Sequence, residues 1–199
     1  MERRHLWWPI ALGIFLAATL TGCGEYRYRA MASIDEPIMA PVFTLTDYDG
    51  APFALDAQRG NIVLLFFGFT SCPDVCPTTL AELAAVRKNL GADAARVRTV
   101  VITVDPERDT ADKLKRYVQV FDPAAIGLLA DRPALEAVYR DYGVVAQRRD
   151  LPDSALGYTI DHTSAVYVID AAGRWVGLFG YGAPVSDITA DLQHLLAAR

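Results

Sequence analysis

Residues 61–77 read NIVLLFFGFTSCPDVCP, and this stretch decides the fold. The unbroken apolar run Asn61–Phe67 contains β-branched residues and is typical of a strand that is buried on both faces. Two cysteines follow it. Apolar residues at helical spacing then predict a helix from Val75 to Leu90, which Gly91 ends. The stretch therefore predicts a buried strand that passes through a cysteine-containing loop into a helix.

Strands and helices alternate through the rest of the chain, which favours an α/β fold around a mixed central sheet in one domain. Asp49-Gly50 is a turn signal and predicts an N-terminal hairpin from Phe43 to Leu55. Ser186 or Asp187 is expected to cap the last helix, and Asp109 or Thr110 an earlier one. The further predicted strands are Val97–Val104, Ile126–Leu129, Val144–Arg148 paired with Tyr158–Asp161, Ser164–Ile169 and Trp175–Tyr181; the further predicted helices are Ala111–Phe121, Pro133–Tyr142 and one ending at Leu196.

Composition excludes several classes of protein. The chain has 199 residues, a net charge of −5 and 22% charged residues, with no basic tract, so nucleic acid is not an expected partner. Ordinary glycine and proline contents exclude collagen-like and low-complexity chains. Three cysteines are too few for a fold held together by disulfides, and their odd number needs an explanation.

The N-terminus explains one cysteine. Residues 1–22 have the positive start and the short apolar stretch of a signal peptide. Leu20-Thr21-Gly22-Cys23 resembles the lipobox of bacterial lipoproteins, in which the leader is cut before a cysteine that is then lipidated. We therefore expect a lipid at Cys23, a tether over 23–40 and a domain over 41–199 on the periplasmic face of a bacterial membrane. The alternative, an uncleaved anchor with an incidental cysteine, gives the same compartment.

Cys72 and Cys76 are placed for chemistry. Side chains four residues apart face the same way on a helix, so this pair is spaced to form a disulfide or to bind one soft ion. The start of a helix also stabilises the thiolate, which is the form that binds metals and attacks disulfides. A purely structural disulfide is the alternative, although so short a loop would gain little stability from it.

A third ligand must come from the histidines. His194 lies in the last predicted helix and is expected to be an ordinary surface or packing residue, whereas His162 comes directly before a predicted strand, where it can reach the cysteine loop. Two thiolates and an imidazole favour copper, as Cu(I) or Cu(II), over zinc, because a structural zinc site needs four ligands. Asp161 and Asp74 are candidates to support these ligands.

Three separated motifs resemble the Sco/SenC family: GFTSCPDVCP at 68–77, VDPERDT at 104–110 and DHT at 161–163. The resemblance covers about residues 41–196. It implies a thioredoxin-like fold, copper bound by Cys72, Cys76 and His162, and a hairpin insertion over 144–161 before the ligand histidine. It also implies a role in assembling the dinuclear copper centre of cytochrome c oxidase. Many members keep a transmembrane helix, where this chain is expected to use a lipid.

Two functions follow from the resemblance and the thiol pair. One is a copper metallochaperone that receives copper from a donor protein or another copper source and passes it to the copper-receiving oxidase subunit. The other is a thiol–disulfide oxidoreductase that reduces the partner's copper-binding cysteines and has no clear need of His162. A redox or copper sensor is a third option. We expect a monomer, and we expect Glu107 and Arg108 to brace their loop and not to line the site.

Overall fold

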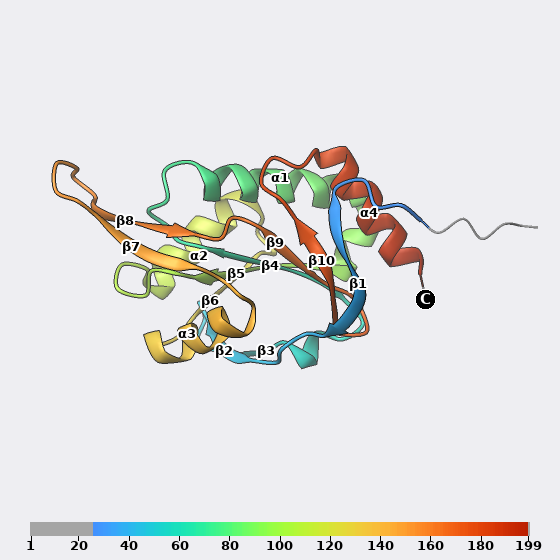
Figure 1. Ribbon diagram of the computed structural model, residues 1–199, viewed down its shortest axis with the longest axis horizontal. Coiled ribbons are helices and arrows are strands. Elements are labelled where there is room, and N and C mark those ends of the chain that lie inside the picture. Colours follow the sequence, from blue (N-terminus) through green and yellow to red (C-terminus); the bar gives the residue numbers. More distant parts are fainter. Residues whose placement is uncertain (1–25, 199) are drawn as a thin grey trace, which may run out of the picture.

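The computed structural model describes residues 26–198 (Figure 1). Eight strands form one mixed sheet in the order β1-β10-β9-β4-β5-β6-β2-β3, and β7 and β8 form a separate two-stranded sheet. The strands are β1 Met31–Met39, β2 Thr44–Asp47, β3 Pro52–Ala54, β4 Ile62–Gly68, β5 Val97–Thr103, β6 Ile126–Leu129, β7 Ala146–Leu151, β8 Gly157–His162, β9 Val166–Ile169 and β10 Arg174–Phe179; the α-helices are α1 Val75–Leu90, α2 Ala111–Phe121, α3 Arg132–Asp141 and α4 Val185–Ala197, with short 3-10 turns at Asp56–Gln58 and Gly91–Arg96.

The centre of the sheet confirms the α/β prediction. Every residue of β4 is buried, and β4 pairs in parallel with β5 and antiparallel with β9. Figure 1 shows α1 and α4 together above the sheet and α3 on its other side. Helices on both faces explain why β4 is apolar throughout and does not alternate. The buried strand β4 therefore fixes the position of the cysteine loop that follows it, beside the end of β5.

Most predicted elements lie where the sequence placed them. The helices α1 and α2 have the predicted bounds, and the N-terminal hairpin is formed by β2 and β3. The Thr110 hydroxyl accepts the Lys113 amide and so caps α2. The predicted cap of the last helix was wrong: α4 begins at Val185 after Pro184, which places Ser186 and Asp187 inside its first turn.

The tether prediction differs from the structure. Residues 31–39, which were expected to be part of a tether, form β1 and pair antiparallel with β10 at the edge of the main sheet. The preceding residues are fixed as well, because the buried Asp191 carboxylate on α4 accepts the backbone amides of Arg29, Ala30 and Met31. The folded unit thus begins well before residue 41. Cys23 and the predicted leader lie outside the described residues.

The strands β7 and β8 form the predicted hairpin, which Figure 1 shows projecting at the end of the molecule opposite α4. They pair from Ala146 with His162 to Leu151 with Gly157. His162 is therefore the last residue of β8, where the hairpin returns to the main sheet through β9. Among residues 26–198, no helix is both long enough and apolar enough to cross a membrane.

Candidate metal centre

Cys72, Cys76 and His162 come together as the sequence predicted. Each offers one ligand atom, and the three atoms lie within 4.8 Å of one another. Cys76 Sγ is 3.5 Å from His162 Nε2, and both cysteines are free thiols. The chain thus brings together a loop, the first turn of α1 and the end of β8, although His162 lies 86 residues after Cys76 in the sequence.

The thiol pair is built differently from the helical pair that was predicted. Cys72 lies in the loop before α1, and only Cys76 is inside the helix. The backbone amide of Cys76 donates to Cys72 Sγ at 3.4 Å, so this sulfur satisfies one of the unpaired amides at the helix start. Pro77, in the first turn of α1, lacks the backbone N–H that this turn would leave unpaired. The two sulfurs meet because the loop folds back onto the helix end.

Gly68 makes room for the buried thiol. A Cβ atom at this position would lie 3.1 Å from Cys76 Sγ and 2.8 Å from the ring of Phe66. Cys76 itself has no exposed surface, whereas Cys72 is half-buried. The last residue of β4 is therefore small because the sulfur packs directly against the strand.

The two thiols differ in acidity. The hydrogen bond from Cys76 lowers the pKa of Cys72 to about 4, and contacts with His162 and with the backbone amides of Cys76 and Asp74 add to this effect. The same hydrogen bond, together with burial, raises the pKa of Cys76 far above its ordinary value. These opposite shifts favour ionisation of Cys72 over that of Cys76. The thiolate is the form that binds a soft metal ion.

His162 is oriented by the backbone and by aromatic rings. Its Nδ1 lies 3.0 Å from the carbonyl oxygen of Thr163, which leaves Nε2 facing the thiols. The rings of Phe69 and Phe66 lie 5.7 and 6.2 Å away in edge-on geometry. This arrangement is the usual one for a metal-binding histidine, whose second nitrogen is held by a neighbouring acceptor.

Both predicted supporting residues, Asp74 and Asp161, line the hollow at the site, but among the described residues neither carboxylate hydrogen-bonds to a ligand side chain. The Asp161 carboxylate pairs with Arg149 at 2.8 Å, and both side chains of this pair are exposed. Asp74 borders the site, but its side chain makes no capping hydrogen bond to α1. The acceptor that orients His162 is the Thr163 carbonyl, a backbone group that no sequence pattern marks.

A different carboxylate supports the cysteine loop. Asp109 is buried and accepts the Thr70 amide, the Thr70 hydroxyl at 2.6 Å and the Thr103 hydroxyl at 2.6 Å. Burial raises the pKa of Asp109, although these hydrogen bonds act in the opposite direction. From the sequence, Asp109 was predicted as a possible helix cap and belongs to the VDPERDT motif, but neither observation predicts this role. The structure makes it the link between the cysteine loop and the loop after β5.

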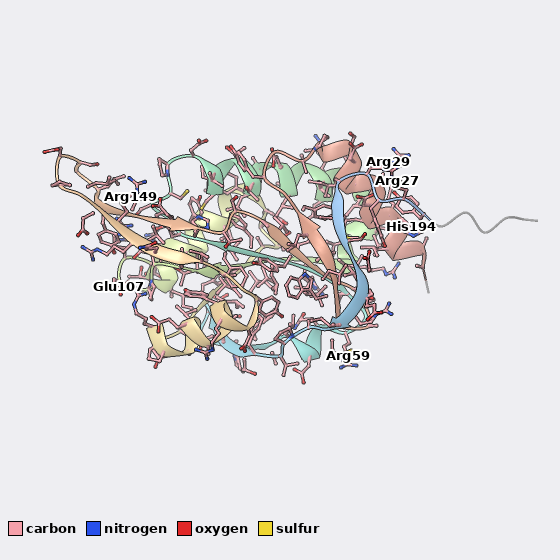
Figure 2. The ribbon with its side chains drawn as sticks, viewed as in Figure 1. Arg27, Arg29, Arg59, Glu107, Arg149 and His194 are labelled. Carbon is pink, nitrogen blue, oxygen red and sulfur yellow. The ribbon has the colours of Figure 1, made fainter. Side chains whose placement is uncertain are left out.

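A shallow hollow of about 300 Å³ gives access to the centre. Its lining includes Cys72, His162 and the apolar residues Phe69 and Ile160. Figure 2 places Arg149 and Glu107 at this end of the molecule, and Arg27, Arg29 and His194 at the other. His194 stacks on Tyr26 with ring centroids 3.7 Å apart, which confirms it as a packing residue.

Two sulfur ligands and one imidazole with an open side suit a soft ion in a low-coordinate site, and copper fits best. The SCO1/SenC family model matches residues 31–197. The chain belongs to this family. The match begins at β1, in agreement with a folded unit that starts before residue 41. It therefore includes the strand that the sequence interpretation assigned to a tether.

Individual relatives and solved structures agree with this family assignment. A SCO2-like protein of Rickettsia felis is 38% identical over 193 residues, which cover 90% of this chain and 94% of the relative. A copper-bound ScoI structure from Bradyrhizobium japonicum is 39% identical with a TM-score of 0.72, covering 79% of this chain and 99% of that one. Copper-bound Arabidopsis thaliana ScoI is 31% identical with a TM-score of 0.74, covering 81% and 99%. Thermus thermophilus apo Sco1, 34% identical with a TM-score of 0.76, supports the thioredoxin-like fold that family membership implies.

Proposed function

We propose that this protein is a copper metallochaperone that binds copper through Cys72, Cys76 and His162 and delivers it to the dinuclear copper centre of cytochrome c oxidase during assembly. The observation that carries the proposal is the convergence of these three ligand atoms within 4.8 Å. Copper-bound structures of two family members support the choice of metal. The copper here is cargo, which a donor protein or another copper source supplies.

The geometry suits transfer as well as binding. Three protein ligands leave a soft ion with an unfilled coordination position, and the hollow beside Cys72 and His162 lets an incoming ligand reach it. A partner thiolate or imidazole would bind to the ion from that side and then replace the protein ligands one at a time. A closed four-ligand site would oppose this exchange.

The proposed location is the periplasmic face of a bacterial membrane, with a lipid at Cys23. Three residues span at most about 10 Å, so a lipid at Cys23 would hold Tyr26 and the α4 end of the molecule close to the membrane surface. The β7–β8 hairpin, which carries His162, lies at the other end (Figure 1). Membrane fractions of expressing cells should contain the protein, and Cys23→Ser should release it or leave its leader uncleaved.

Copper spectroscopy on reduced protein tests the proposal. Wild type should show thiolate-to-copper charge-transfer bands with Cu(II), and His162→Ala should weaken or shift them. His194→Ala is the matched control, because it removes the other imidazole of the described chain and should leave the spectrum unchanged. If a variant that lacks both Cys72 and Cys76 takes up copper as wild type does, the proposal fails.

The alternative function is a thiol–disulfide oxidoreductase. The half-buried Cys72, with its lowered pKa, favours it. The Cys72 thiolate would attack a partner disulfide, and Cys76 would then displace the partner, leaving a Cys72–Cys76 disulfide and two reduced partner thiols. Reduction of an oxidised oxidase-subunit peptide by His162→Ala at the wild-type rate, together with unchanged copper spectra in that variant, would favour this function.

A further inference from the structure

The hairpin that carries His162 is weakly connected to the rest of the domain. β7 and β8 pair only with each other, and the β8 residue Ile160 packs into the core. Within residues 26–198, the side chains of Arg108 and Tyr158 make all the hydrogen bonds between the hairpin, residues 146–162, and the rest of the domain, apart from those of His162. The position of a metal ligand thus depends on very few polar contacts.

Arg108 is the centre of this connection. Its Nη1 donates to the backbone carbonyls of Leu156 at 3.2 Å and Tyr158 at 3.0 Å, and its Nε pairs with the Asp105 carboxylate. The guanidinium lies 3.6 Å from the centre of the Tyr158 ring and 5.8 Å from that of Phe69. Planar stacking together with several directed donors is a combination that arginine supplies and lysine does not.

Asp105 is the third residue of this connection between the hairpin and the rest of the domain. It has no exposed surface, and besides Arg108 it accepts the Tyr158 hydroxyl at 2.8 Å. Its backbone is fixed in turn, because its amide donates to Thr103 and its carbonyl accepts the Asp109 amide. The same short loop therefore contacts both halves of the metal centre. Asp109 holds the cysteine loop through Thr70, and Asp105 with Arg108 holds the histidine hairpin.

We propose that Arg108 is a positioning residue for copper: together with Asp105 and Tyr158 it fixes the β7–β8 hairpin so that His162 reaches the thiol pair. This inference rests on the proposed function, because it concerns the same three ligands. Arg108 does not touch the metal. It acts by holding the strand whose last residue is the imidazole ligand. The Phe69 ring is near both groups, with its centroid 5.8 Å from the guanidinium and 5.7 Å from the His162 ring.

A double-mutant cycle separates positioning from general stability. Arg108→Gln should weaken Cu(II) binding by about 10- to 100-fold, the usual effect of removing a group that orients a metal ligand, and should shift the charge-transfer bands toward those of His162→Ala. In the His162→Ala background, Arg108→Gln should change the affinity by less than about threefold, because the ligand that it positions is gone.

Two further variants keep the inference testable. Tyr158→Phe removes only the hydroxyl bond to Asp105 and should produce a smaller shift in the same direction. Arg149→Gln removes an equal charge from an exposed ion pair of the same hairpin and should leave the spectrum as in wild type. If Arg108→Gln weakens copper binding equally with and without His162, or keeps the wild-type spectrum, the inference is wrong. If wild type binds no copper, the proposed function itself fails.

Discussion

Replacing Asp191 by alanine should release the N-terminal segment from α4. The carboxylate accepts the Tyr26 hydroxyl at 2.9 Å and the amides of Arg29, Ala30 and Met31 at 2.8–3.1 Å, and it has no exposed surface. Alanine leaves these donors without an acceptor, and a buried unpaired donor costs about 1–3 kcal/mol. Because only the Met31 bond is fully buried, we expect a total loss of about 3 kcal/mol.

Thermal and urea unfolding measure this loss. For a chain of this size, about 3 kcal/mol corresponds to a fall in Tm of roughly 6–12 °C. Asp187→Ala, one turn earlier in α4, is the control. Among the described residues, the Asp187 side chain accepts a hydrogen bond only from the Ser186 hydroxyl, so its removal should cost less than about 1 kcal/mol through the helix dipole. Equal losses in the two variants would refute the account of Asp191.

The pKa of Asp191 determines how the stability difference between wild type and Asp191→Ala depends on pH. Burial alone would raise the pKa of Asp191, but the backbone amides of residues 29–31 and the Tyr26 hydroxyl outweigh it and lower the pKa. The stabilisation is therefore complete above the unfolded-state pKa of about 3.9 and is lost as the pH falls through the lower folded-state pKa. The stability difference between wild type and Asp191→Ala should be constant from pH 8 to 5 and shrink below about pH 4.

Three further predictions concern the metal centre. Gly68→Ala should weaken copper binding by about tenfold, because the new methyl group crowds Cys76 Sγ and displaces a ligand; calorimetric titration with Cu(I) measures this, and unchanged affinity would contradict it. Iodoacetamide should modify the half-buried Cys72 long before the fully buried Cys76, as peptide mass mapping will report; the reverse order would show that the loop opens. Asp109→Ala should lower the free energy of unfolding by about 2–3 kcal/mol, because the Thr70 and Thr103 donors lose their acceptor; a loss below about 0.5 kcal/mol in urea unfolding would contradict this.

Local patterns explain what the sequence could predict. The bounds of α1 follow from helical spacing and Gly91, and the buried β4 follows from an apolar run that both faces of the sheet require. Cys72, Cys76 and His162 could be selected because few sulfur and imidazole groups are present, and each precedes or follows a predicted buried strand. The small number of candidate ligands was therefore as informative about the site as the periodicity of apolar residues was about the helices and strands.

Non-local partners explain what the sequence could not predict. In β1 only Met31 is buried, so this edge strand lacks the alternation that marks a half-buried strand, and its residues resemble a linker. Asp191 accepts amides about 160 residues away, and Asp109 holds a threonine 39 residues away. Each carboxylate lies next to or inside a predicted helix, where an exposed position is the ordinary expectation. Burial of these groups becomes visible only when the distant segment is in place.

The unequal burial of the two thiols predicts the order in which the three ligands release copper during the proposed transfer. Cys72 and His162 line the open hollow, whereas Cys76 is enclosed by β4 and the start of α1. An incoming ligand therefore meets the ion on the Cys72–His162 side and displaces those two ligands first. Because the hydrogen bonds that hold the hairpin bearing His162 come from Arg108 and Tyr158, withdrawal of the imidazole is expected to disturb the core less than withdrawal of Cys76. Cys76, fixed in the helix and against the sheet, is expected to be the last ligand to release copper.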